Sequence, residues 1–125
     1  MSPVPFEVKS EELDGGIRAF TVRGELDMNT APEFERKLGE VPIDSGASIM
    51  LDLSQCEFID STGIALIVRT WQQLDRKAGG EGEGEGRLVL CSHNHQVRRL
   101  LKITGVDRSI SMHDQRAAAL AELRD

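Results

Sequence analysis

The stretch of residues 49–74 constrains the fold most, because its hydrophobic pattern changes period in the middle. It opens with an apolar run at residues 49–51 that continues through Asp52 to Leu53, which is typical of a buried strand. After the polar cluster at residues 60–63, apolar residues recur at three- and four-residue spacings: Ile64, Ile67, Val68, Trp71 and Leu74. That spacing places them on one face of a helix. The stretch therefore predicts a buried strand, a loop and a long amphipathic helix.

The start of that helix is the first candidate functional site. Asp60 or Ser61 is placed to be its N-cap. The first N–H groups of a helix lack intrahelical partners and carry the positive end of its dipole, so an anion attached to Ser61 would be well placed. Gly63 has no Cβ, and we expect it to leave the backbone open to another molecule. The local pattern fits a plain cap and a modified or contacted serine equally well.

Length and composition set the class of protein. A chain of 125 residues with 39% hydrophobic and 29% charged residues is typical of one globular domain. The net charge of -6 argues against a nucleic-acid partner, and no apolar run approaches the length of a membrane span. The start of the sequence has no secretory signal, and Cys56 and Cys91 give no disulfide framework. We therefore expect a cytoplasmic protein with two buried thiols.

Strand and helix patterns alternate on both sides of the central stretch. Residues 4–9 and 17–23 read as strands joined by a glycine turn at residues 14–16. Thr30 and Glu33 match a capping box, ahead of a helix that should bury Phe34, Leu38 and Val41. Residues 54–57 read as a turn that ends the central strand.

The second half of the chain continues the alternation. A strand at residues 87–91 precedes a helix that Asn94 should cap and Gly105 should end. A short strand within residues 106–112 and a helix capped by Asp114 follow, and the apolar residues of that helix are Ala118, Leu120 and Leu123. We expect an α/β fold, a single domain over residues 1–125 with a mixed sheet of four to five strands packed against about four helices. The glycine–glutamate run at residues 78–86 should form a mobile loop within it.

The sequence contains no complete motif for a nucleophilic serine, a zinc site or a phosphate-binding loop. A nucleophilic serine needs a G-x-S-x-G turn and a histidine, whereas Ser61 lies in I-D-S-T-G and all three histidines are distant in sequence. Cys91, His93 and His95 alternate as zinc ligands can, but no fourth ligand is evident. The glycine–glutamate run lacks the lysine of a phosphate-binding loop. We expect no catalytic site, no metal and no cofactor.

A receiver domain of a response regulator is the main alternative. Asp52 in the buried strand, Glu11 and Glu12 upstream and Lys102 downstream resemble the acidic pocket and lysine of such a domain. Asp52 would then accept a phosphoryl group. A receiver, however, needs a helix after its first strand, and the turn at residues 14–16 leads straight into a second strand.

Four motifs in order give the chain a resemblance to a known family: residues 24–27, 52–54, 58–63 and 87–90. From about Val4 to about Leu123 the chain resembles the bacterial anti-sigma factor antagonists of the STAS domain family. The segment D-S-T-G, between a strand and an amphipathic helix, is its most specific part. The resemblance implies a mixed sheet flanked by helices. It also implies partner switching: the unphosphorylated form binds a kinase-type anti-sigma factor and frees its sigma factor.

The same resemblance implies the residues of the switch. The anti-sigma factor serine kinase would phosphorylate Ser61, and a PP2C-type phosphatase would remove the phosphate. Asp27, Asp60, Thr62 and Gly63 would form the contact surface with Ser61. A phosphate would add about two negative charges beside Asp60 and weaken binding on the order of a hundredfold. A STAS scaffold outside sigma-factor control is the remaining alternative.

Overall fold

The computed structural model describes residues 4–78 and 86–124, and a five-stranded sheet forms its centre. The strands are β1 (Glu7–Leu13), β2 (Ile17–Leu26), β3 (Ser48–Ile59), β4 (Leu88–Cys91) and β5 (Ser111–His113). They lie in sequence order across the sheet. β1 is antiparallel to β2, and the other neighbouring pairs are parallel. The mixed sheet predicted from the sequence is confirmed. Most of the glycine–glutamate run expected to be a mobile loop, residues 79–85, lies outside the described residues.

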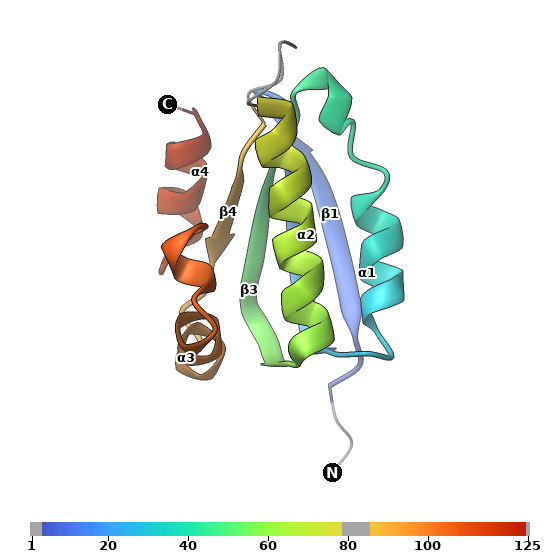
Figure 1. Ribbon diagram of the computed structural model, residues 1–125, viewed down its shortest axis with the longest axis vertical. Coiled ribbons are helices and arrows are strands. Elements are labelled where there is room, and N and C mark those ends of the chain that lie inside the picture. The colour runs from blue at the N-terminus through green and yellow to red at the C-terminus, as the bar shows by residue number, and fades with distance from the viewer. Residues whose placement is uncertain (1–3, 79–85, 125) are drawn as a thin grey trace.

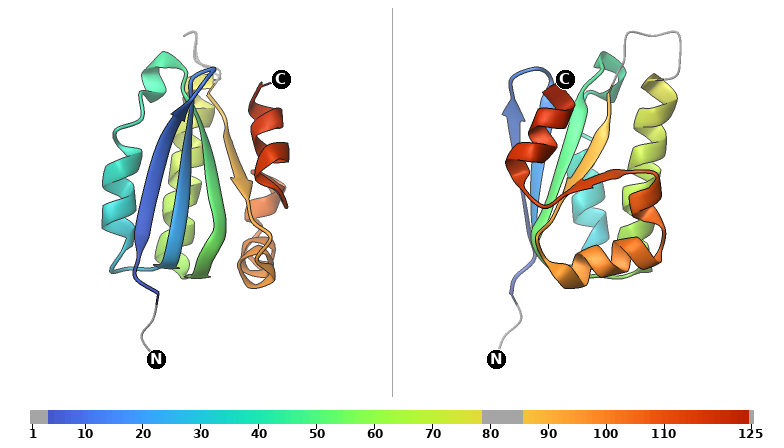
Figure 2. Two further views of the ribbon diagram at one scale, coloured as in Figure 1. Left: turned by 180° about the vertical axis from the view of Figure 1, so that it is seen from behind. Right: turned by 90° about the vertical axis from the view of Figure 1, so that its left-hand side faces the viewer.

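Helices cover the two faces of the sheet unequally. They are α1 (Ala31–Leu38), α2 (Ser61–Ala78), α3 (His95–Ile103) and α4 (Arg116–Arg124), with 3-10 turns η1 (Ile43–Ser45) and η2 (Val106–Arg108). α1 and α2 lie side by side in front of the sheet, and α3 lies at the lower end, beneath β4 (Figure 1). α4 packs on the opposite face beside β4, and the rear of β1 and β2 stays open among the described elements (Figure 2).

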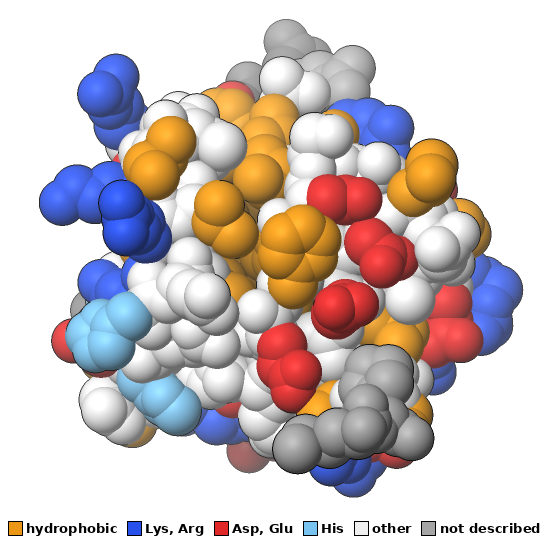
Figure 3. Space-filling model, turned by 90° about the horizontal axis from the view of Figure 1, so that it is seen from below, with side chains coloured by type: hydrophobic (Ala, Val, Ile, Leu, Met, Phe, Trp, Pro, Cys, Tyr) orange, Lys and Arg blue, Asp and Glu red, His pale blue; other side chains and the backbone are white. Residues whose placement is uncertain are grey.

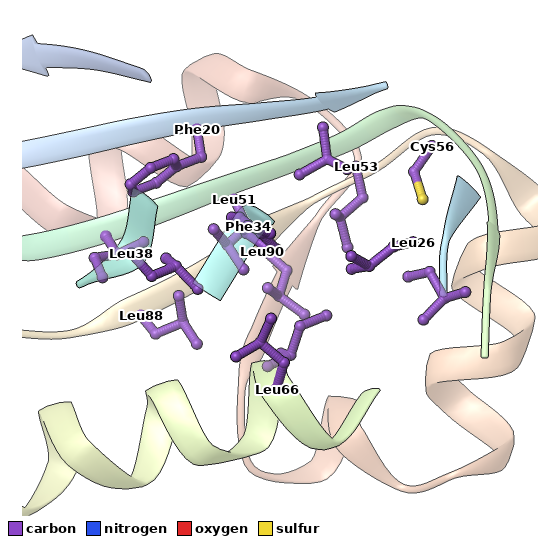
Figure 4. Close-up of a cluster of buried hydrophobic side chains, with 14 of the residues drawn as sticks. Phe20, Leu26, Phe34, Leu38, Leu51, Leu53, Cys56, Leu66, Leu88 and Leu90 are labelled. Carbon is purple, nitrogen blue, oxygen red and sulfur yellow. The ribbon is translucent and has the colours of Figure 1, made fainter. Parts of the chain in front are cut away.

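The main core lies between the sheet and the front helices. Phe20 of β2 meets Phe34 of α1 edge to face, with ring centroids 5.8 Å apart. Leucines from β2, β3, β4, α1 and α2 fill the space around this pair (Figure 4). A smaller core lies under α4, formed by Ala19, Met50, Val89, Cys91 and Ala119. The fold thus has one large apolar layer and a thin second one.

The buried face of α2 is rotated from the one predicted. Ile67 and Leu74 are buried as expected, but Ile64, Val68 and Trp71 are only partly buried. Leu66 and Thr70 are buried as well. α2 packs on α1 in addition to the sheet, so its covered stripe is turned toward that neighbour. Thr70 is satisfied there because its hydroxyl donates to the carbonyl of Leu66 at 2.9 Å.

The two central strands are longer than the sequence indicated. The turn predicted at residues 54–57 is wrong, because β3 runs on to Ile59, and β2 runs through residues 24–26. Their parallel pairing extends to Leu26 opposite Ile59, with register shifts between Thr21 and Arg23 and again after Gly24. Such irregularities bend a strand while its pairing continues, which explains why a polar segment remains in the sheet.

Other elements match their predictions with local changes. The first strand begins later, at Glu7, and forms the sheet edge. Asn94 caps α3 by accepting from the N–H groups of Gln96 and Val97, as predicted. Ala119 rather than Ala118 is the buried alanine of α4.

Candidate functional site

The lower end of the sheet brings the polar cluster of residues 60–63 beside the loop that leads to α1. β2 and β3 are parallel neighbours, so their carboxyl ends lie at the same edge (Figure 2, left). The N–H of Asp60 donates to the carbonyl of Leu26 at 3.1 Å and closes that edge. Two segments more than 30 residues apart in sequence therefore meet at one place.

Asp60 is the N-cap of α2. Its Oδ1 accepts from the N–H of Gly63 at 3.0 Å, and its carbonyl accepts from the N–H of Ile64 at 3.0 Å. Its other oxygen, Oδ2, accepts from the N–H of Met28 at 3.1 Å. One carboxylate thus fixes the start of α2 and ties it to the loop before α1.

Ser61 is consequently the first residue of α2 and not its cap. Its side chain is exposed, and its hydroxyl has no hydrogen bond within residues 4–78 and 86–124. Thr62 follows it, half-buried. The positive end of the helix dipole lies next to the exposed Ser61 hydroxyl, so a negatively charged group attached to Ser61 would be stabilised there. Of the two readings left open by the sequence, the plain cap is wrong for Ser61.

The loop at residues 27–30 is held by its own side chains. Asp27 Oδ1 accepts from the N–H groups of Asn29 at 2.9 Å and Thr30 at 3.1 Å. Thr30 Oγ1 accepts from the N–H of Asp27 at 2.9 Å and donates to the carbonyl of Glu25 at 2.7 Å. The capping box predicted for Thr30 is wrong, because its hydroxyl is engaged in this loop and makes no cap bond to α1. The capping-box pattern did not indicate this geometry; Asp27 two residues before Asn29 and three before Thr30 is the sequence signal that could have done so, because an aspartate often accepts from N–H groups two or three residues on.

Gly63 serves internal packing. A Cβ at this position would lie 2.8 Å from Leu26 Cγ, 2.9 Å from the Leu26 carbonyl oxygen and 3.0 Å from Ile59 Cγ2. The expectation that Gly63 leaves its backbone open to another molecule is wrong, because β2 and β3 fill that space. The missing side chain instead lets the first turn of α2 sit directly on the strand ends.

Asp52 does not form a receiver pocket. It lies within β3, 13% exposed, where Oδ1 accepts from the N–H of Ser54 at 3.0 Å and Oδ2 lies 3.6 Å from Arg116 Nη1. Arg116 also binds Glu11 at 2.6 Å, whereas Lys102 is an exposed residue of α3. β1 turns directly into an antiparallel β2 with no intervening helix. The receiver alternative is therefore wrong.

The cysteines and histidines form no obvious site. Cys56 and Cys91 are buried free thiols, as predicted. Burial raises the pKa of both thiols, and for Cys91 the nearby Asp52 carboxylate raises its pKa further. His93 and His95 are exposed, and the described residues hold no group of three His, Cys, Asp or Glu side chains placed to bind a metal.

The family follows from comparison with known proteins. The STAS domain model matches residues 10–119. The chain belongs to the STAS domain family. Within the part of this STAS domain that the structure describes, no helix is both long and apolar enough to span a membrane.

Three proteins similar to this STAS domain are named as anti-sigma factor antagonists. It is 32% identical over 85 residues to the anti-sigma-B factor antagonist of Staphylococcus aureus, covering 68% of this chain and 72% of that protein. It is 24% identical over 109 residues to the anti-sigma-F factor antagonist RsfB of Mycobacterium tuberculosis, with coverages of 87% and 83%. The crystal structure of an anti-sigma factor antagonist from Mycobacterium paratuberculosis is 28% identical, has a TM-score of 0.81 and covers 97% of this chain and 96% of that one.

Proposed function

We propose that this STAS domain is an anti-sigma factor antagonist whose lower end binds a kinase-type anti-sigma factor. Binding would release the sigma factor held by that kinase. Ser61 would be the phosphorylation site, with Asp27, Asp60, Thr62 and Gly63 shaping the contact surface around it. The chain would be a binding protein and a kinase substrate in the cytoplasm, not an enzyme.

The observation that carries this proposal is that Asp60, and not Ser61, caps α2. The cap of α2 is provided by Asp60, so the Ser61 hydroxyl is exposed and not needed to hold the helix. A kinase must bring the terminal phosphate of its nucleotide close to the hydroxyl it phosphorylates. A phosphate already on Ser61 would then meet both the bulk and the negative charge of that nucleotide, and binding would weaken.

The chemistry of the phosphate tests the modification. Incubating the chain with its kinase and labelled ATP should label Ser61 as a phosphate ester, which is stable in acid and to hydroxylamine. Ser61→Ala should take up no label, and a PP2C-type phosphatase should remove it from the wild type. Label retained in Ser61→Ala would contradict the proposal. A chain that meets no such kinase would instead be a STAS scaffold outside sigma-factor control.

A further inference from the structure

Resting on the function proposed above, we propose that Met28 is the apolar anchor that seats this chain in a pocket of the anti-sigma factor kinase, and that the rim of this pocket is basic. Met28 lies in the loop at residues 27–30. Its identity would help decide which anti-sigma factor the chain binds.

Exposure singles out Met28. Only three large hydrophobic side chains are exposed in the described part of the chain: Met28 at 68%, Phe58 at 45% and Ile103 at 69%. Met28 and Phe58 both lie near Asp60, but Met28 is the more exposed of the two, and its N–H donates to the Asp60 carboxylate that caps α2. A side chain with most of its surface in water contributes little to the core, so the fold does not require an apolar residue there.

The backbone that carries Met28 is already ordered. The N–H groups of Asp27, Met28 and Asn29 each donate to a side-chain oxygen, at 2.9, 3.1 and 2.9 Å. Binding through Met28 therefore needs little further ordering of the loop, which lowers the entropic cost of association. An unbranched thioether side chain also adapts to the shape of an apolar pocket.

The charge around Met28 indicates the character of the partner's surface. The ends of β2 and β3 and the residues after them carry four carboxylates: Glu25, Asp27, Glu57 and Asp60. None of the four has a salt bridge to a Lys, Arg or His side chain among residues 4–75 and 86–124, whose side chains the structure describes. Acidic side chains gather beside apolar ones on this face (Figure 3). A partner that buries Met28 must come close to these charges, so Lys or Arg around its pocket would complement them.

Affinity for the kinase tests the anchor. The probes are the purified kinase-type anti-sigma factors of the organism that encodes this chain, loaded with ADP and titrated calorimetrically with unphosphorylated variants. Met28→Ala should weaken binding about tenfold or more, and Met28→Leu should stay within about threefold of wild type. Ile103→Ala is the matched control, since it removes an equally exposed side chain, and should stay within about twofold. Melting temperatures of all variants should differ by less than about 2 °C.

The outcomes separate the anchor from the switch. If the wild type binds and Ser61→Asp does not, but Met28→Ala binds as the wild type does, the switch stands and the anchor is wrong. An equal loss for Ile103→Ala would also overturn the assignment to Met28. The association rate should fall as NaCl rises from about 0.05 M to about 0.5 M, and a rate independent of salt would overturn the basic rim. A wild type that binds none of the kinases would overturn both the function and the anchor.

Discussion

Two neighbouring residues at the start of α2 have separate tasks. Asp60 caps the helix and holds the Met28 N–H, while Ser61 has an exposed hydroxyl with no hydrogen bond in the described structure. A modification of Ser61 would thus leave the bonds that hold the helix end in place. The sequence could not separate the two residues, because serine and aspartate are both good N-caps and stand side by side.

Gly63 shows how closely the same turn is packed. Gly63→Ala should lower the free energy of unfolding by about 1–3 kcal/mol, because the new Cβ would lie 2.9 Å from the Leu26 carbonyl oxygen, a backbone atom that cannot move aside cheaply. Gly39→Ala is the control: it also lies at a helix end, and its Cβ would meet nothing closer than 3.4 Å. Urea melts of both variants measure the difference. Equal stabilities would show that the turn is loosely packed.

The sequence predicted the type and order of the helices and strands better than the residues at which they begin and end. The hairpin at residues 14–16, the helix capped by Asn94 and the apolar strand β4 give strong local signals. The lower halves of β2 and β3 do not, because residues 54–57 are polar and turn-like by themselves. Their conformation is set by pairing between the two strands, a tertiary effect that local pattern does not contain.

α4 is held to the sheet by few buried apolar residues. Ala119 is its only buried residue in the described part, and much of its attachment is polar. Arg116 reaches three strands, with Glu11 at 2.6 Å, Thr21 at 3.5 Å and Asp52 at 3.6 Å. Helices attached in this way are candidates for local opening.

Removing the Arg116 side chain should loosen α4 alone. Since Arg116 and Glu11 are both partly exposed, the contacts contribute about 0.5–1 kcal/mol, and amide exchange in α4 should rise about threefold in Arg116→Ala. Amides of α2 should be unchanged. Arg99→Ala removes an exposed arginine from α3 and serves as the control. Hydrogen exchange read by mass spectrometry would contradict this account if α2 and α4 changed together.

At the scale of the whole molecule, the two apolar layers each enclose a thiol. Cys56 belongs to the main core and Cys91 to the core under α4. Their raised pKa values mean that folding favours the neutral thiol. This stabilisation is complete below the ordinary thiol pKa of about 8.5 and is lost as pH rises through the folded-state pKa.

Stability should therefore decline at alkaline pH because of the thiols. The chain has no tyrosine that would titrate in the same range. Between about pH 8 and about pH 10 the free energy of unfolding should fall more steeply in the wild type than in the double variant Cys56→Ala, Cys91→Ala. Denaturant melts across that range give both slopes. Parallel curves would mean that the thiols ionise as freely in the folded protein as in the unfolded one.

The arrangement of the strands also explains why the sequence analysis did not identify Met28 as part of the site. Ser61, Asp60 and Asp27 were predicted from their motifs, and the fold places their two segments in contact. Met28 carries no motif of its own. It becomes noticeable only when parallel pairing of β2 and β3 brings its N–H to Asp60 and leaves its side chain in water.

The affinity of the chain for its anti-sigma factor kinase, measured by titration calorimetry as a function of the state of Ser61, tests the central claim most directly. Wild type and Ser61→Ala should bind alike, since alanine removes a hydroxyl that holds nothing in the fold. The Ser61 phosphoprotein should bind on the order of a hundredfold more weakly. Melting curves should confirm that all three forms are folded. Equal affinities for folded wild type, Ser61→Ala and phosphoprotein would contradict the switch.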